Sequence, residues 1–173
     1  MKPQRKIVVG LGNPGKAFEN TYHNVGALAL RYIVGDLAFK THRALFSFAT
    51  SDDAAFILPL TFMNESGAAV REALKKFNGG PEDLIVIHDE SDLPVGKYKV
   101  SLGRNAAGHK GVQSIVDTLH TKSFTRIRIG IRPQNERQRK KAETFVLKNI
   151  TAKDQGVLRK VFDEIADALP GLR

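Results

Sequence analysis

A histidine and an aspartate occupy the two parts of the sequence best placed to do chemistry. His23 lies in the loop after a predicted strand at Lys6–Leu11, and Asp89 lies at the carboxyl end of a second predicted strand, Leu84–Ile87. Open α/β sheets place their sites at this edge. A carboxylate there can hold an imidazole in one tautomer and stabilise its protonated form. The pair would then be a general base able to activate water.

Plainer interpretations exist for these loops. Taken alone, His23 is more typical of a surface loop in which Asn24 is the N-cap of the next helix. Asn64, in the loop Thr61–Gly67, is either a helix N-cap or an amide that contacts a substrate backbone. The glycines of Gly108–Gly111 (GHKG) either let backbone N–H groups face an anion or cap the following helix.

The sequence excludes or disfavours several other chemistries. It has no cysteine, which excludes thiolate nucleophiles, disulfides and cysteine-based metal sites. It has no G-x-S-x-G motif, and no two histidines are four residues apart, so we expect neither a serine nucleophile nor a metal site. Gly10–Gly15 matches the G-x-G-x-x-G dinucleotide pattern, but the polar segment Lys16–Asn24 follows it instead of a helix. A tight loop is the simpler interpretation of these glycines.

Positive charge is concentrated in one segment. The formal net charge is +9, from 27 Lys and Arg against 18 Asp and Glu. Lys97–Lys148 holds 13 of the basic residues and 3 of the acidic ones, so the rest of the chain is close to neutral. Such a one-sided field favours a polyanionic partner, most simply a nucleic acid, over a basic surface kept for solubility.

The spacing of apolar residues predicts alternating strands and helices. The predicted strands are Lys6–Leu11, Ala44–Thr50, Ala54–Leu58, Leu84–Ile87, Lys97–Leu102 and Phe124–Ile131. The predicted helices are Val25–Val34, one carrying Val70–Phe77, one carrying Val112–Leu119, and a last one that Thr151 and Asp154 cap. In the strand Phe124–Ile131, the isoleucines fall on one face and Arg126 and Arg128 on the other.

These elements predict a single α/β domain over residues 1–173, with a mixed twisted β-sheet and helices on both faces. A chain of this length, 42% hydrophobic, can bury about 70% of its unfolded surface. No apolar run approaches the ~20 residues of a membrane span, and the first residues lack the apolar stretch of a secretory signal. We therefore expect a cytoplasmic protein that does not contact a membrane.

Six segments in order carry a resemblance to a known family. They are Val9–Gly15 (VGLGNPG), Thr21–Gly26 (TYHNVG), Pro59–Gly67 (PLTFMNESG), His88–Gly96 (HDESDLPVG), Gly108–Gly111 (GHKG) and Phe124–Ile131 (FTRIRIGI). Together they resemble the bacterial peptidyl-tRNA hydrolases over about Lys6 to Leu147. The resemblance implies a monomeric, metal-independent esterase without a cofactor. Such an enzyme cuts the ester between a nascent peptide and the terminal ribose of tRNA.

The resemblance also implies roles for individual residues. His23 corresponds to the general base and Asp89 to the carboxylate that orients it. The implied substrate-binding set is Asn13, Phe18, Met63, Asn64 and Lys110. The basic residues implied or expected to contact the tRNA acceptor stem are Lys99, Arg128, Arg139 and Lys141.

Some positions depart from the family pattern. Lys110 replaces a usual asparagine, and a lysine cannot accept a hydrogen bond. Phe18 replaces a usual tyrosine, and Tyr22 a usual arginine. A second hypothesis is therefore an RNA-binding protein on the same scaffold with little or no hydrolysis. The presence of both His23 and Asp89 favours the enzyme.

Overall fold

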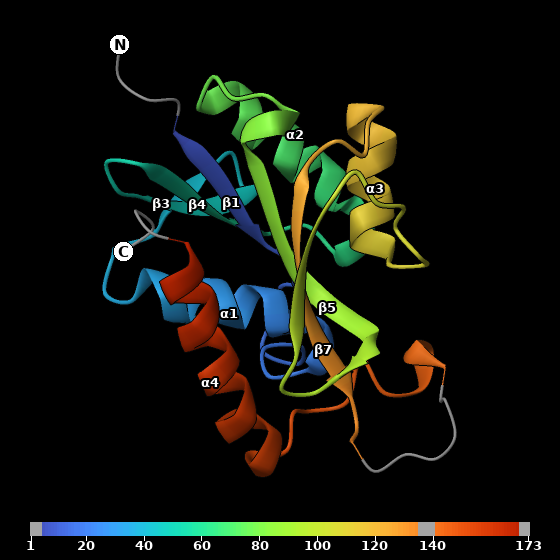
Figure 1. Ribbon diagram of the computed structural model, residues 1–173. Coiled ribbons are helices and arrows are strands. Elements are labelled where there is room, and N and C mark those ends of the chain that lie inside the picture. The colour runs from blue at the N-terminus through green and yellow to red at the C-terminus, as the bar shows by residue number, and fades with distance from the viewer. Residues whose placement is uncertain (1–4, 135–140, 170–173) are drawn as a thin grey trace.

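Seven strands form one mixed sheet in the computed structural model, which describes residues 5–134 and 141–169 (Figure 1). The strands are β1 (Lys6–Gly10), β2 (Lys40–His42), β3 (Phe46–Thr50), β4 (Ala54–Pro59), β5 (Leu84–Pro94), β6 (Tyr98–Leu102) and β7 (Thr125–Arg132). Their order across the sheet is β2-β3-β4-β1-β5-β7-β6. The central strands β4, β1, β5 and β7 are parallel, and the outer strands are antiparallel to their neighbours. The parallel strands therefore bring their carboxyl ends to one edge.

Four α-helices cover the two faces of this sheet. They are α1 (Val25–Val34), α2 (Ser66–Lys76), α3 (Lys110–Leu119) and α4 (Ala152–Ala168), joined by short 3-10 helices η1 (Tyr22–Asn24), η2 (Met63–Glu65), η3 (Pro81–Asp83) and η4 (Ala142–Thr144). Helices α1 and α4 pack into one apolar cluster, and α2 and α3 into a second cluster on the opposite face (Figure 1). The predicted α/β sheet with helices on both faces is confirmed. Among the described residues, no helix is long and apolar enough to cross a bilayer.

Local sequence signals fix several of these elements as predicted. Helix α1 has the predicted bounds, because its nearly continuous apolar surface is buried between β1, β5 and α4. At the start of α4, the Thr151 hydroxyl accepts a hydrogen bond from the Asp154 N–H at 3.2 Å. This bond is the first half of the predicted capping pattern. The β3–β4 hairpin also forms around Ser51–Asp53, with antiparallel pairing from Phe46 to Thr50.

Three strands differ from the prediction by more than one residue, and the smallest of these differences is in β3, which begins at Phe46 instead of Ala44. Strand β5 continues beyond Ile87 to Pro94, because β7 supplies parallel hydrogen-bonding partners as far as Glu90 and again at Pro94. Strand β2 was not predicted. It joins β3 through a turn in which Arg43 and Ala44 both have positive φ angles of 48° and 54°. Turns of this kind usually carry Asn-Gly or Asp-Gly, so the sequence gives no signal for this hairpin.

Two of the three arginines of β7, Arg126 and Arg128, are buried. Arg126 and Arg128 do lie opposite the isoleucines, but that face is covered as well. Arg126 donates a hydrogen bond from Nη2 to the Asn105 carbonyl at 2.8 Å, in the loop between β6 and α3. Arg128 pairs with Glu90 on the neighbouring strand β5 at 3.2 Å. The alternation was therefore correct, but it separates two buried faces.

A very close contact sets the start of α1 against the sheet. A Cβ atom on Gly26 would lie 2.2 Å from the carbonyl oxygen of Ile87 in β5. A Cβ atom on Gly10 in β1 would in turn lie 2.6 Å from the Gly26 carbonyl oxygen. Glycine is needed at both positions, because any side chain would push α1 off the ends of β1 and β5. The helix start, and the residues just before it, are thereby held at the carboxyl edge of the sheet.

We expect Gly26→Ala to lower the free energy of unfolding by at least about 2 kcal/mol, because the methyl group overlaps the β5 backbone. Gly156→Ala is the matched control, since Gly156 is exposed inside α4 and has open space around it. The control should raise stability by about 0.5–1 kcal/mol, the helix-propensity gain from Gly to Ala. Urea unfolding followed by circular dichroism measures both changes, and a Gly26→Ala protein as stable as the wild type would contradict the packing argument.

Candidate active site

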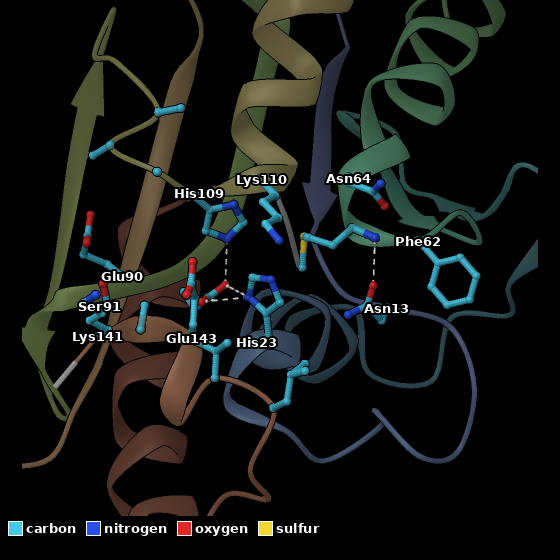
Figure 2. A pocket seen from close by; sticks show the side chains of 18 residues that line it. Asn13, His23, Phe62, Asn64, Glu90, Ser91, His109, Lys110, Lys141 and Glu143 are labelled. Carbon is cyan, nitrogen blue, oxygen red and sulfur yellow. Dashed lines mark hydrogen bonds and ion pairs between the residues drawn. The ribbon is translucent and has the colours of Figure 1, made fainter.

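A pocket of about 700 Å³ opens at the carboxyl edge of the central strands (Figure 2). Seven of the residues predicted from the sequence line it: Asn13, His23, Met63, Asn64, Asp89, Lys110 and Lys141. They come from six separate parts of the chain, which the parallel strands and the helices that follow them bring together. The clustering predicted for His23 and Asp89 is therefore confirmed as geometry.

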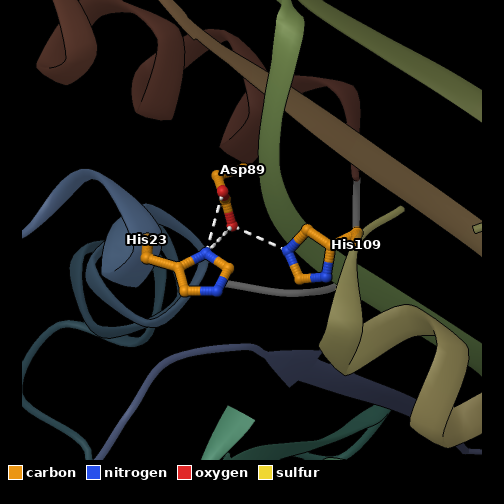
Figure 3. Close-up of side chains that lie close together, drawn as sticks. All are labelled: His23, Asp89 and His109. Atoms are coloured by element: carbon orange, nitrogen blue, oxygen red, sulfur yellow. Dashed lines mark hydrogen bonds and ion pairs between the residues drawn. The ribbon is translucent and has the colours of Figure 1, made fainter. Parts of the chain in front are cut away.

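His23 and Asp89 form a direct hydrogen-bonded pair (Figure 3). Nδ1 of His23 lies 2.9 Å and 3.0 Å from the two carboxylate oxygens of Asp89. An ionised carboxylate only accepts hydrogen bonds, so Nδ1 carries the proton and donates it. Nε2, on the other side of the ring, then keeps a lone pair. This is the tautomer in which the imidazole of His23 can take a proton from water.

His109 is a third member of this network, and the sequence analysis missed it. Its Nε2 lies 2.8 Å from Oδ1 of Asp89 (Figure 3). Its Nδ1 accepts a hydrogen bond from the Val112 N–H at 3.3 Å, which makes His109 the side-chain N-cap of α3. Because Nδ1 accepts, Nε2 carries the proton and donates to Asp89. One imidazole thus ties the start of a helix to the buried carboxylate.

Asp89 is a buried charge held by two donors. Burial by itself raises the pKa of Asp89, but His109 and His23 together outweigh it and hold the pKa well below its ordinary value. The carboxylate therefore stays ionised throughout the neutral range and orients both imidazoles.

A third imidazole ring packs behind the network. His88 is buried, and its Nδ1 donates to the Asp89 carbonyl oxygen at 2.7 Å. Burial, with the neighbouring His109 next, lowers the pKa of His88 well below its ordinary value, so this imidazole is neutral. Its ring meets that of His109 edge-on, with centroids 4.6 Å apart. His88 therefore restricts how His109 can turn.

Two asparagines fix the loop after β1 on the opposite wall. The Asn24 side chain does not cap α1. Its Oδ1 accepts from the Asn13 N–H at 2.8 Å, and its Nδ2 donates to the Asn13 carbonyl at 2.9 Å. The Asn13 Oδ1 in turn accepts from the Met63 N–H at 2.7 Å (Figure 2). This bond fixes the amide of Asn13, whose Nδ2 has no hydrogen-bond partner among residues 5–134 and 141–169.

Asn64 and Lys110 are exposed at the mouth of the pocket. Asn64 lies within η2, and the N-cap of α2 is Glu65, so the N-cap interpretation of Asn64 is wrong. Lys110 is the first residue of α3. Behind it, a Cβ atom on Gly111 would lie 2.5 Å from the sulfur of Met63, so α3 begins in direct contact with this wall.

Of the other predicted site residues, Lys99, Arg128 and Phe18 do not line the pocket. Lys99 is exposed on the edge strand β6, whereas the side chain of Arg128 is only 8% exposed and is paired with Glu90. Arg128 therefore does not lie on an open basic surface, because the second face of β7 is covered. Phe18 is partly buried in the loop before η1 and does not line the pocket. Arg139 falls outside the described residues.

Several apolar and acidic pocket residues were not singled out from the sequence. Phe62 and Leu147 are both more than half exposed and form apolar walls, while Glu90 and Glu143 add acidic groups. Exposed side chains of this kind are recognised by their place around a pocket and not by spacing.

The His23, Asp89 and His109 ligand atoms also lie within 4.8 Å of one another, as in a candidate metal site. Two imidazoles and a carboxylate are a donor set that zinc accepts. Here the three atoms already serve one another as hydrogen-bond partners, so a metal ion would have to displace both protons donated to Asp89. The expectation of a metal-free site stays a prediction.

Around the pocket lie an imidazole with a free lone pair, a carboxylate that orients it and a fixed amide, which are the groups that a hydrolase uses to activate water. The comparisons with known proteins point to the same class. The sequence profile described as peptidyl-tRNA hydrolase matches residues 7–172. The chain therefore belongs to the peptidyl-tRNA hydrolase family.

Individual relatives agree with the family match. A peptidyl-tRNA hydrolase of Hydrogenobaculum is 34% identical over 171 residues, covering 94% of this chain and 87% of that protein. One of Lactobacillus delbrueckii is 40% identical over 133 residues, covering 73% and 72%. The crystal structure of the Acinetobacter baumannii peptidyl-tRNA hydrolase superposes with a TM-score of 0.82 at 26% identity, covering 96% of this chain and 87% of that one.

The lowered pKa of Asp89 predicts an acid-dependent stability. As the pH falls, the unfolded chain takes up this proton first, near an ordinary pKa of ~3.9. The stability that the ionised carboxylate adds is thus complete above that pKa and is lost as the pH approaches the lower folded value. Urea unfolding between about pH 5 and pH 2.5 should show a shallower fall for Asp89→Asn than for wild type. Asp52→Asn, in the exposed β3–β4 turn, is the control, and equal slopes for Asp89→Asn and wild type would disprove the assignment.

Proposed function

We propose that this chain hydrolyses the ester between a peptide and the terminal ribose of tRNA, with His23 as the general base. The observation that carries the proposal is the His23–Asp89 pair, whose geometry leaves Nε2 of His23 with a lone pair at the pocket. Family membership supplies the substrate class. A protein that only bound RNA would gain nothing from a carboxylate that holds this tautomer.

The reaction needs one proton to move twice. Nε2 of His23 takes a proton from water as the water oxygen attacks the ester carbonyl, which forms a tetrahedral oxyanion. The oxyanion then collapses and expels the ribose oxygen, and the imidazolium of His23 returns its proton to that oxygen. The products are a peptide with a free carboxyl group and a tRNA with a free ribose hydroxyl. Each step is supplied by this chain's residues, so the proposal includes no metal or cofactor.

The walls of the pocket suit the two parts of such a substrate. The fixed amide of Asn13 and the exposed amide of Asn64 offer hydrogen bonds to the peptide backbone and the terminal nucleotide. Met63 and Phe62 add apolar contact area beside them. Lys110 completes the substrate-binding set. Phe18 is left outside the set, because it does not line the pocket.

The tRNA acceptor stem would be held chiefly through its phosphates. Lys99 on β6 and Lys141 at the pocket are exposed cations suited to this role, and Arg139 is assigned to it by resemblance. Arg128 would contribute only by exchanging its partner Glu90 for a phosphate. We further propose that the protein acts as a monomer in the cytoplasm, where peptidyl-tRNA is made.

Single-turnover hydrolysis of an N-acetyl-aminoacyl-tRNA tests the base. We expect the wild type to release tRNA and His23→Ala to lose at least about a thousandfold in rate, as for the loss of a base that acts within a hydrogen-bonded unit. The affinity of His23→Ala for tRNA should stay within about twofold, because the imidazole does not meet phosphates.

His120→Asn is the matched control for this experiment. It removes an exposed imidazole at the far end of α3, and asparagine tolerates the left-handed backbone there (φ 53°). Its rate should equal that of the wild type. Tight tRNA binding by a wild-type protein that released no product would instead support the RNA-binding hypothesis.

The salt dependence of tRNA binding tests the basic surface. Replacing both Lys99 and Lys141 by alanine should weaken binding and lower the slope of log K against log salt by about 1–2, since each phosphate contact releases counterions. Lys153→Ala with Lys160→Ala removes the same charge from the exposed side of α4 and should leave the slope unchanged. Hydrolysis of a minimal ester without tRNA should stay within about twofold in all these variants. An unchanged slope in the Lys99 and Lys141 variant would show that these lysines do not meet the tRNA.

A further inference from the structure

Lys110 is a cation in the pocket that the protein itself does not neutralise. Among the described residues, it has no ion-pair partner within 4.0 Å. Two acidic groups of the pocket are already engaged: Asp89 accepts from two histidines, and Glu90 pairs with Arg128. The charge of Lys110 is therefore available to a ligand.

The position of this lysine is unusual for its helix. It is the first residue of α3, and the first turn contains no acidic residue. A lysine at the positive end of a helix is electrostatically unfavourable, so helix stability does not account for it. The preceding residue, His109, is hydrogen-bonded to Asp89. This bond fixes the backbone of Lys110 relative to His23, which is bonded to the same carboxylate. Figure 2 shows its ammonium directed into the pocket, on the side of the His23 ring.

The proposed reaction creates one new negative charge near His23, on the carbonyl oxygen of the ester. The fixed Nδ2 of Asn13 can donate one hydrogen bond to that oxygen, but an amide is neutral. A donor that carries charge gains most between the neutral ester and the oxyanion, which lowers the barrier instead of merely tightening substrate binding.

We propose that Lys110 is a catalytic residue whose ammonium donates a hydrogen bond to the oxyanion of the tetrahedral intermediate. This inference rests on the proposed hydrolysis. The lysine keeps its proton throughout, while His23 moves the proton of water to the departing ribose oxygen. The oxyanion forms when water adds to the carbonyl and disappears when the bond to the ribose oxygen breaks, so no further reactant is needed.

A phosphate of the terminal nucleotide is the competing partner for this cation. The two roles differ in what the lysine does for a substrate that has no phosphate. A phosphate contact acts on binding and is lost with the phosphate, whereas oxyanion stabilisation acts on kcat and persists. A 3′-O-(N-acetyl-aminoacyl)adenosine, which has the same ester and no phosphate, separates them.

The experiment compares wild type, Lys110→Met and Lys110→Arg on N-acetyl-aminoacyl-tRNA and on the phosphate-free ester. For Lys110→Met we expect kcat to fall at least about tenfold on both substrates, less than for a fully buried oxyanion donor because Lys110 is exposed. KM should stay within about threefold. Lys110→Arg, which keeps the charge, should recover part of the lost kcat. Lys160→Met, an exposed lysine of α4, is the control and should match the wild type.

The outcomes separate this inference from the proposed function. A loss seen only with tRNA, and mainly in KM, would assign Lys110 to a phosphate and overturn the oxyanion role. Full activity of Lys110→Met alongside an inactive His23→Ala would overturn it while leaving the hydrolase intact. No hydrolysis by the wild type would overturn both. Equal melting temperatures for wild type and Lys110→Met would show that any loss is not a loss of fold.

Discussion

The buried carboxylate of Asp89 is the group on which the rest of the site depends. A charge this deeply buried is costly unless donors surround it, and here two imidazoles supply the donors. The same two bonds decide the tautomers of His23 and His109. The tautomer that leaves Nε2 of His23 with a lone pair therefore depends on the ionised carboxylate, and the carboxylate stays ionised because the two imidazoles donate to it. The carboxylate of Asp89 and the two imidazoles therefore hold one another in place.

Three elements must converge for this arrangement to form, and the backbone packing brings them together. Strand β5 carries Asp89, the turn before α1 carries His23, and the start of α3 carries His109. The close approaches at Gly26 and Gly111 set the first turn of each helix against its neighbour. Glycine at each contact allows this close approach, because any side chain there would push the two elements apart. The geometry of the site is thus a consequence of how tightly α1 begins on β5 and α3 begins on Met63.

Sequence patterns predicted the parts of this molecule whose causes are local. Periodicity found α1 and the central strands, and the edge rule for α/β sheets brought His23 and Asp89 together. His109 was missed because a histidine that is both an N-cap and a partner of a distant carboxylate has no local signature. The alternation in β7 was found, but it cannot tell a solvent-facing side from one buried against Asn105 and Glu90. Whether that side is buried depends on residues distant in the sequence, here the loop that carries Asn105 and the strand that carries Glu90.

The burial of Arg126 and Arg128 changes how the positive charge of the segment Lys97–Lys148 can act. The charge of Arg128 is offset by Glu90, and Arg126 is buried against the neutral carbonyl of Asn105, so neither guanidinium can contact a polyanion directly. Direct contact is left to the exposed cations of the segment, among them Lys99, Lys110 and Lys141. Lys99 lies on the outer strand β6, whereas Lys110 and Lys141 line the pocket that contains His23. In the proposed reaction, an anionic substrate would therefore meet positive charge both at the surface and at the place where the reaction creates negative charge.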